Sequence, residues 1–167
     1  MAVMSKLDAR LYWTEVSGHA MGGAAFKTKL EAALEWVNGT GLGQADILWA
    51  ATRPVASGAN DDIDFAGVLS SAFGVTITAA EMVAIFIKSS AANTTNLTLG
   101  QGSTNPMILM GGTAPTTVIR PGGVRIFAEK DAAGLCTVTG GSADTLRIAN
   151  ASGAAASYDI AILARSA

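Results

Sequence analysis

The chain has 167 residues, of which 50% are hydrophobic and 14% are charged, and its formal net charge is −2. This length suits one domain with a real core, so we predict a single domain over residues 1–167. The charged fraction is well below the roughly 25% of typical soluble domains. The Lys and Arg residues are scattered singly and create no basic field, which argues against nucleic acid as a partner. Because a lone monomer would expose much weakly solvated surface, we expect a homo-oligomer or a component of a larger assembly.

The beginning of the chain lacks the apolar region of a signal peptide, and the longest strongly apolar stretch, residues 82–87, is far too short to span a bilayer. We therefore expect a soluble protein made in a cytoplasm, with no membrane partner. The single cysteine, Cys136, cannot form an internal disulfide or a zinc-binding pair of thiols, and we expect it to pack in a strand.

The first third of the chain contains three predicted strands. Residues 7–16 and 45–52 have strand patterns, and we expect Pro54 to end the second because proline removes a ladder donor. Residues 26–37 are ambiguous. Apolar positions 26, 30, 33, 34 and 37 match a helical stripe, whereas positions 26, 30, 32, 34 and 36 match one face of a strand, with Lys and Glu on the other. Glycine-rich turn signals on both sides favour the strand.

Residues 66–73 are the one segment with a helical pattern. Asp64 can accept an orphan N–H at the start, apolar residues at 68, 69, 72 and 73 share a face, and Gly74 can supply a left-handed stop. We predict a short helix that covers an edge of the fold. Residues 78–81 match a capping box, but the β-branched and aromatic run that follows favours a strand.

The rest of the chain is a series of short strand-like runs separated by Gly, Asn and Ser clusters, at residues 83–87, 97–99, 124–127, 146–148 and 158–163. Residues 120–123, Arg-Pro-Gly-Gly, predict a tight turn into the third run. Both faces of the last run are apolar near Leu163, which predicts a central strand or one that meets a neighbouring subunit. The fold class is therefore all-β, an antiparallel jelly-roll-like sandwich with one short helix.

No residues gather with the spacing of a catalytic site. His19 is the single histidine and would have to serve as the base of any triad from within a loop. Residues 60–64 offer carboxylates at Asp61, Asp62 and Asp64 that could bind calcium, but they lack the glycine and distal glutamate of a calcium loop, and a solvated turn is the better interpretation. Residues 39–44 lack the third glycine of a dinucleotide fingerprint. We predict no enzymatic activity, no cofactor and no metal.

Tryptophan and methionine are the best candidates for contacts with a partner. Trp13, Trp36 and Trp49 could belong to the core, to a subunit interface or to a glycan-binding platform. Met107 and Met110 belong to an apolar run that suits core or interface. These five residues and Leu163 are the predicted interface candidates.

Several segments, taken together and in order, resemble small virion structural proteins of tailed bacteriophages. They span the chain from about residue 7 to 167, and most of them are turns. The segments are residues 39–41, 43–46, 62–67, 72–74, 85–88, 120–123, 143–150 and 158–160. The resemblance implies a particle component with a jelly-roll-like sandwich and assigns no active residue.

This resemblance, with the low charge, leads to the expectation of a capsid decoration or cement protein that stabilises the shell by binding across capsid subunits. Its partners would then be copies of itself and the major capsid protein or other virion proteins, and its location would be the virion, assembled in the host cytoplasm. The alternatives are a tail component, either a tube or a tip subunit, and a glycan-binding receptor module.

Overall fold

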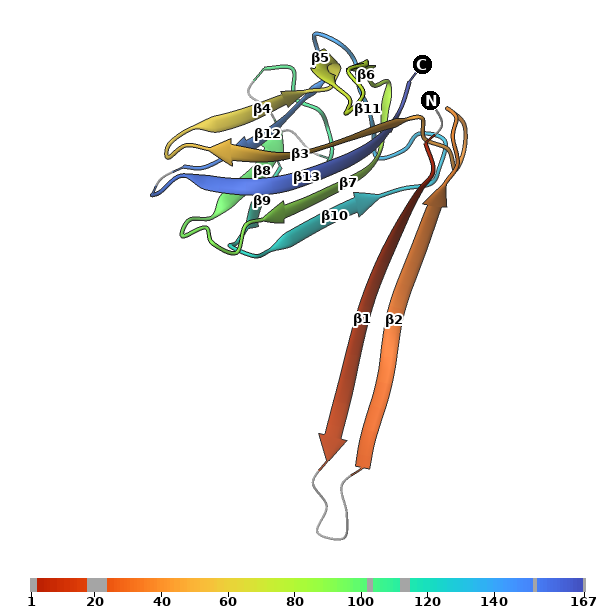
Figure 1. Ribbon diagram of the computed structural model, residues 1–167, viewed down its shortest axis with the longest axis vertical. Coiled ribbons are helices and arrows are strands. Elements are labelled where there is room, and N and C mark those ends of the chain that lie inside the picture. Colours follow the sequence, from red (N-terminus) through yellow and green to blue (C-terminus); the bar gives the residue numbers. More distant parts are fainter. Residues whose placement is uncertain (1–2, 18–23, 102–103, 112–114, 152, 167) are drawn as a thin grey trace.

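The computed structural model describes residues 3–17, 24–101, 104–111, 115–151 and 153–166, and within them the chain forms strands and no helix. Figure 1 shows two parts, a sandwich that we call the body and a long projecting hairpin that we call the arm. The strands are β1 (Ser5–Ser17), β2 (Ala24–Trp36), β3 (Ile47–Val55), β4 (Asn60–Asp64), β5 (Ala66–Ser70), β6 (Thr76–Thr78), β7 (Glu81–Ser89), β8 (Leu97–Gln101), β9 (Thr116–Ile119), β10 (Val124–Ala128), β11 (Cys136–Thr137), β12 (Thr145–Ala149) and β13 (Ala156–Arg165).

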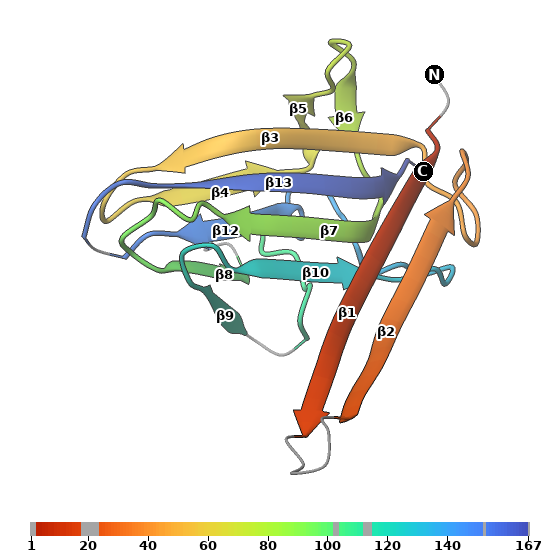
Figure 2. The same ribbon diagram turned by 60° about the horizontal axis from the view of Figure 1, so that its bottom comes forward.

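The body consists of two antiparallel sheets that face each other (Figures 1 and 2). One sheet has the order β10-β7-β13-β3, with β11 also paired to β7, and the other has the order β4-β12-β8-β9. The predicted all-β antiparallel sandwich is therefore confirmed. The predicted central position of the last strand is confirmed as well, because β13 lies between β7 and β3.

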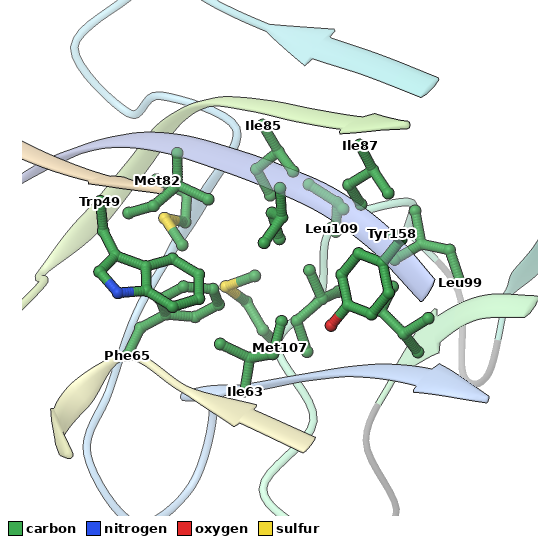
Figure 3. Close-up of a cluster of buried hydrophobic side chains, with 14 of the residues drawn as sticks. Trp49, Ile63, Phe65, Met82, Ile85, Ile87, Leu99, Met107, Leu109 and Tyr158 are labelled. Atoms are coloured by element: carbon green, nitrogen blue, oxygen red, sulfur yellow. The ribbon is translucent and has the colours of Figure 1, made fainter. Parts of the chain in front are cut away.

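Alternation along the strands builds the core between the sheets. In β13, Tyr158, Ile160 and Ile162 are buried and point inward, as expected from a period of two. Figure 3 shows the inward side chains of both sheets meeting in one cluster. Trp49 and Phe65 meet there edge to face, with ring centroids 6.3 Å apart and planes at 82°.

The predicted turn at residues 120–123 is confirmed, and it joins the two sheets. The Gly123 N–H donates to the Arg120 carbonyl at 2.8 Å, and Gly122 has a φ of 72°, which glycine adopts without a Cβ penalty. The strand before this turn, β9, pairs with β8, whereas the strand after it, β10, pairs with β7. A change of sheet at a tight corner explains why this sequence needs proline and two glycines.

Pro54 does not end its strand as predicted. It pairs with Ser157, and β3 continues to Val55. The strand β3 is at the end of the order β10-β7-β13-β3, so one side of its backbone faces no neighbouring strand of that sheet. Proline is tolerated at such an edge because its missing N–H breaks no ladder bond.

The predicted helix at residues 66–73 is wrong. The segment forms β5 and a turn, and with β6 it makes a small hairpin that stands above β3 in Figure 2. The Asp64 carboxylate does accept an N–H, but from Ala66 at 2.8 Å, which closes an Asx turn instead of capping a helix. Gly74, with a φ of 75°, closes the hairpin turn by donating to the Ser71 carbonyl.

The arm is an antiparallel ribbon of two 13-residue strands in continuous register from Ser5 opposite Trp36 to Ser17 opposite Ala24. The predicted strands at residues 7–16 and 26–37 are therefore confirmed as strands. They join neither sheet of the body, which the prediction of one sandwich over residues 1–167 did not foresee. Figures 1 and 2 show the arm crossing one end of the five-stranded sheet and extending past β10, away from the body.

Candidate assembly surface

One face of the arm is apolar along most of its length. Cross-strand partners point to the same side of a ribbon, so the register places Leu11 beside Leu30 on one face. Their side chains are 63% and 69% exposed. We define the apolar face of the arm by the apolar residues on this side beyond the base: Ala9, Leu11, Trp13, Phe26, Leu30 and Ala32. Glu15 and Thr28 lie on the same side.

The opposite face of the arm is charged. Lys6 pairs with Glu35 in the register, and its Nζ lies 3.3 Å from Glu35 and 3.6 Å from Asp8. The hydrogen bond to Glu35 and the nearby Asp8 raise the pKa of Lys6. Lys29 Nζ lies 2.9 Å from Glu31 on the same face. These exposed pairs contribute little stability, but they mark this face as the one that remains in water.

The base of the arm continues the apolar face onto the body. Trp36 is 1% exposed, and its indole N–H donates to the Glu129 carbonyl at 3.3 Å. Leu7 and Leu34 pack with it against Leu163 and other residues on the outer side of the five-stranded sheet. The outward side chain of Leu163 is therefore covered by the protein's own arm.

The next row of that outer sheet face is apolar and uncovered. The register aligns Ala50, Ala161, Phe86 and Ile126 across β3, β13, β7 and β10. Together with Leu48 these residues form a surface that we call the platform. Leu48 is 48% exposed and Ile126 is 41% exposed. A groove of about 260 Å³ runs between the platform and the base of the arm.

A buried arginine holds together the end of the body from which the arm leaves. Arg165, 1% exposed at the end of β13, donates to Glu81 at 2.8 Å and to the backbone carbonyls of Gln44, Asp131 and Ala132 at 2.8–2.9 Å. Guanidinium has five donors in a rigid fork, which suits such a junction. These bonds fix the segments beside the root of the arm, while Trp36 of the arm itself packs on the body.

A second polar cluster links the two sheets of the body. Arg53 from β3 forms two 2.6 Å hydrogen bonds with Asp61 from β4, and the Tyr158 hydroxyl of β13 donates to the same carboxylate at 2.7 Å. Burial alone would raise the pKa of Asp61, but the hydrogen bonds from Arg53 and Tyr158 outweigh it and lower that pKa. We call these three residues the clamp. Each charged group in the clamp has a partner within the fold, so the clamp contributes to the stability of the body.

The carboxylates that could have bound calcium, Asp61, Asp62 and Asp64, each have a different partner. Asp61 points inward to the clamp, whereas Asp62, one residue on, points outward and forms two 2.6 Å hydrogen bonds with Arg147. Asp64 is engaged with the Ala66 N–H. No group of three or more His, Cys, Asp or Glu side chains able to hold a metal occurs among the described residues.

The predicted interface candidates divide between the two parts of the molecule. Trp36, Trp49 and Met107 are buried in the protomer, so their assignment as interface residues is wrong. Each is enclosed by its own chain, Trp36 under the base of the arm and the other two between the sheets. Leu163 is also buried, under the base of the protein's own arm, so its assignment is wrong as well. Met110 is half-buried against the core, and Trp13, 44% exposed on the arm, is the candidate that stays accessible.

The remaining residues singled out in the sequence are Cys136 and His19. Cys136 lies half-buried in β11, where burial raises the pKa of its thiol to about 11. A thiol of that pKa is a poor nucleophile near neutrality. His19 lies outside the described residues. In the part of the chain that the structure describes, no helix is both long and apolar enough to cross a bilayer.

Comparison with known proteins gives no match. No protein-family model, no curated protein and no solved structure matches this chain.

The sequence does not single out the exposed apolar residues of the arm. Its patterns place Leu11, Phe26 and Leu30 on strands but do not mark them as contact residues, and the same holds for Ile126 of the platform. One signal was available. Strands usually have about five or six residues, and an alternating pattern over two runs of more than ten residues exceeds what a small sandwich can cover.

Proposed function

We propose that the protein is a structural component of a tailed-bacteriophage particle, and specifically a capsid decoration or cement protein. Its mechanism is mechanical. It binds the assembled shell and not the free subunits, and burial of apolar surface across their joints shifts the equilibrium toward the closed shell. No substrate, cofactor or metal takes part.

The observation that carries this proposal is an arm that is anchored on the body at its base and whose apolar face is left exposed by the part of the protomer that the structure describes. A two-stranded ribbon is marginally stable alone in water, and exposure of Leu11, Phe26 and Leu30 adds a further cost. Both costs disappear when the face is buried against another subunit. The resemblance of residues 62–67, 120–123 and 143–150 to virion proteins supports the particle as the place where this happens.

Among the alternatives, a glycan-binding module loses most of its basis. Two of the three tryptophans that could stack on sugar rings, Trp36 and Trp49, are enclosed by the protein itself.

A tail component uses the same kind of surface as a decoration protein, so the two differ in what they assemble into. A tube subunit stacks into rings on its own, whereas a decoration protein remains a small oligomer until it meets a shell.

The test is co-sedimentation with empty capsids of the phage whose genome carries the gene. The proposal predicts saturable binding of the wild-type protein to shells and a higher temperature of shell disassembly in its presence. Polymerisation into tubes without shells would move the assignment to the tail. Absence of binding to shells and tails would contradict a role in the particle.

A further inference from the structure

We propose that the apolar face of the arm binds the platform of a second copy of the same chain, and that this exchange closes a homo-oligomer. The inference rests on the proposed function, because it specifies the first partner of an assembly protein. It identifies both surfaces of the contact, the arm (Ala9, Leu11, Trp13, Phe26, Leu30 and Ala32) and the platform (Leu48, Ala50, Phe86, Ile126 and Ala161).

The first argument is continuity with a contact that already exists. At the base of the arm, Leu7 and Leu34 lie on the row of the sheet that contains Leu163. The platform is the adjacent row of the same sheet, and Leu11 and Leu30 are the next large residues of the same arm face. The contact within one copy thus shows the chemistry of the contact between two.

The second argument is that a copy cannot cover its own platform. The arm crosses the end of the sheet and leaves past β10, so its distal part points away from the body (Figures 1 and 2). Consistent with this, the side chains of Leu11 and Leu30 on the arm are mostly exposed, and those of Leu48 and Ile126 on the platform are partly exposed. An arm from another copy has no such constraint.

The third argument is complementarity of size. In the row that forms most of the platform, Ala50 of the edge strand β3 and its neighbour Ala161 of β13 are small, and they leave space beside Phe86 and Ile126. The arm presents large side chains toward its apolar side. Charge does not add to this argument, because Lys88 and Asp159, of opposite sign, are neighbours in the row beyond the platform.

The fourth argument is area. The arm from Ala9 to Ser17 is about 30 Å long and about 10 Å wide, taking about 3.4 Å per residue and two strands about 5 Å apart. One arm on one platform therefore buries roughly 600 Å² in total, about half of the roughly 1,200 Å² at which stable interfaces begin. Reciprocal or cyclic exchange doubles the area for each copy, whereas face-to-face packing of two arms does not and leaves both platforms exposed. A closed arrangement of arm on platform is thus favoured.

The test is the mass of the full-length protein in solution, by native mass spectrometry and analytical ultracentrifugation. The wild type is expected to form a closed oligomer. The double variant Leu11→Asp with Leu30→Asp removes the arm contact, and Ala161→Glu removes the platform contact, so each is expected to be monomeric. Thr14→Asp, on the charged face of the arm, is the matched control and is expected to have the wild-type mass.

Mixing the two defective variants isolates a single contact. The arm variant retains an intact platform and the platform variant retains an intact arm, so a mixture can form one arm-on-platform contact of roughly 600 Å². This is about half of the area at which stable interfaces begin, so the mixture is expected to associate much more weakly than the wild type. Circular dichroism of each variant checks that the body is folded, since Leu11, Leu30 and Ala161 lie outside the main core.

Three results would overturn this inference: a monomeric wild type at high concentration, an oligomer that Ala161→Glu leaves intact, or a mixture of the two variants that associates as strongly as the wild type. These outcomes are separate from those for the proposed function. A monomer that binds shells would refute arm exchange alone, whereas a closed oligomer that ignores shells and tails would refute the virion role alone.

Discussion

Apolar side chains alternate along the strands of both the body and the arm, but they are buried in the body and exposed in the arm. In the body, the inward faces of two sheets meet and side chains such as Phe65 and Ile85 lose all contact with water. In the arm, an equally regular alternation leaves Leu11 and Leu30 exposed. The comparison teaches that an apolar strand face predicts a surface that buries it. The strand pattern does not say whether that surface belongs to the same chain or to another subunit.

The sharpest way to test this difference is one substitution made in both parts. Phe65→Ala in the body is expected to lower the free energy of unfolding by about 3–5 kcal/mol, because it removes a fully buried ring and leaves a cavity. Phe26→Ala in the arm is expected to change the stability of the monomeric arm variant by less than about 0.5 kcal/mol. Chemical denaturation followed by fluorescence measures both. Equal losses would contradict the division into body and arm.

A loss of similar size is expected where the two parts meet. Arg165→Met leaves the Glu81 carboxylate and several backbone carbonyls without their donor. Removing one partner from a buried ion pair costs about 3–5 kcal/mol. Arg53→Met, at the more exposed clamp, is the control and should cost less. If Arg165→Met were as stable as the wild type, the hydrogen bonds of Arg165 would not hold this end of the body together.

The clamp gives a smaller effect with a defined dependence on pH. Asp61→Asn is expected to cost about 1–3 kcal/mol at pH 7, because it weakens hydrogen bonds to a charged group. Since the folded state lowers the pKa of Asp61, its contribution is present above the unfolded pKa of about 3.9 and is lost as pH falls through the lower folded value.

Denaturation midpoints between pH 7 and pH 2 should therefore converge for the wild type and Asp61→Asn. Asp62→Asn, on the outer face of the same strand, provides the control for loss of a carboxylate in a more exposed pair. A difference between the wild type and Asp61→Asn that persisted unchanged at pH 2 would contradict this account of the clamp.

The smallest effect is expected on the charged face of the arm. Lys6→Ala removes two exposed ion pairs, with Glu35 and with Asp8, and should leave both the thermal midpoint and the oligomeric mass unchanged within error. Differential scanning calorimetry and ultracentrifugation check the two quantities. Loss of oligomerisation in this variant would assign the contact to the wrong face of the ribbon.

Local signals in the sequence predicted most of the strands. The period-two pattern at residues 26–37, the turn at 120–123 and the two-sided burial of β13 each depend on neighbouring residues, and each is confirmed. The helix at residues 66–73 failed for a local reason too. An N-cap and an Asx turn begin with the same hydrogen bond to Asp64, and the apolar stripe that favoured the helix is exposed on a hairpin.

The candidate site was harder to predict because it depends on distant parts of the chain. Trp36 becomes core only because the arm folds back on β13 at its base, and Ala161 becomes part of a surface only because β3, β7 and β10 align beside it. Neither relation is contained in the spacing of nearby residues. The composition supports only a general expectation of partners, because charged residues are few.

The central claim is that the arm is completed by another subunit whereas the body is complete by itself. Amide hydrogen exchange at several protein concentrations tests it most directly, with the body as the internal control. We expect protection of backbone amides in β1 and β2 to rise with concentration as copies associate, and protection in β7 and β13 to stay constant. Arm amides that are equally protected at every concentration, or unprotected at all of them, would contradict the claim.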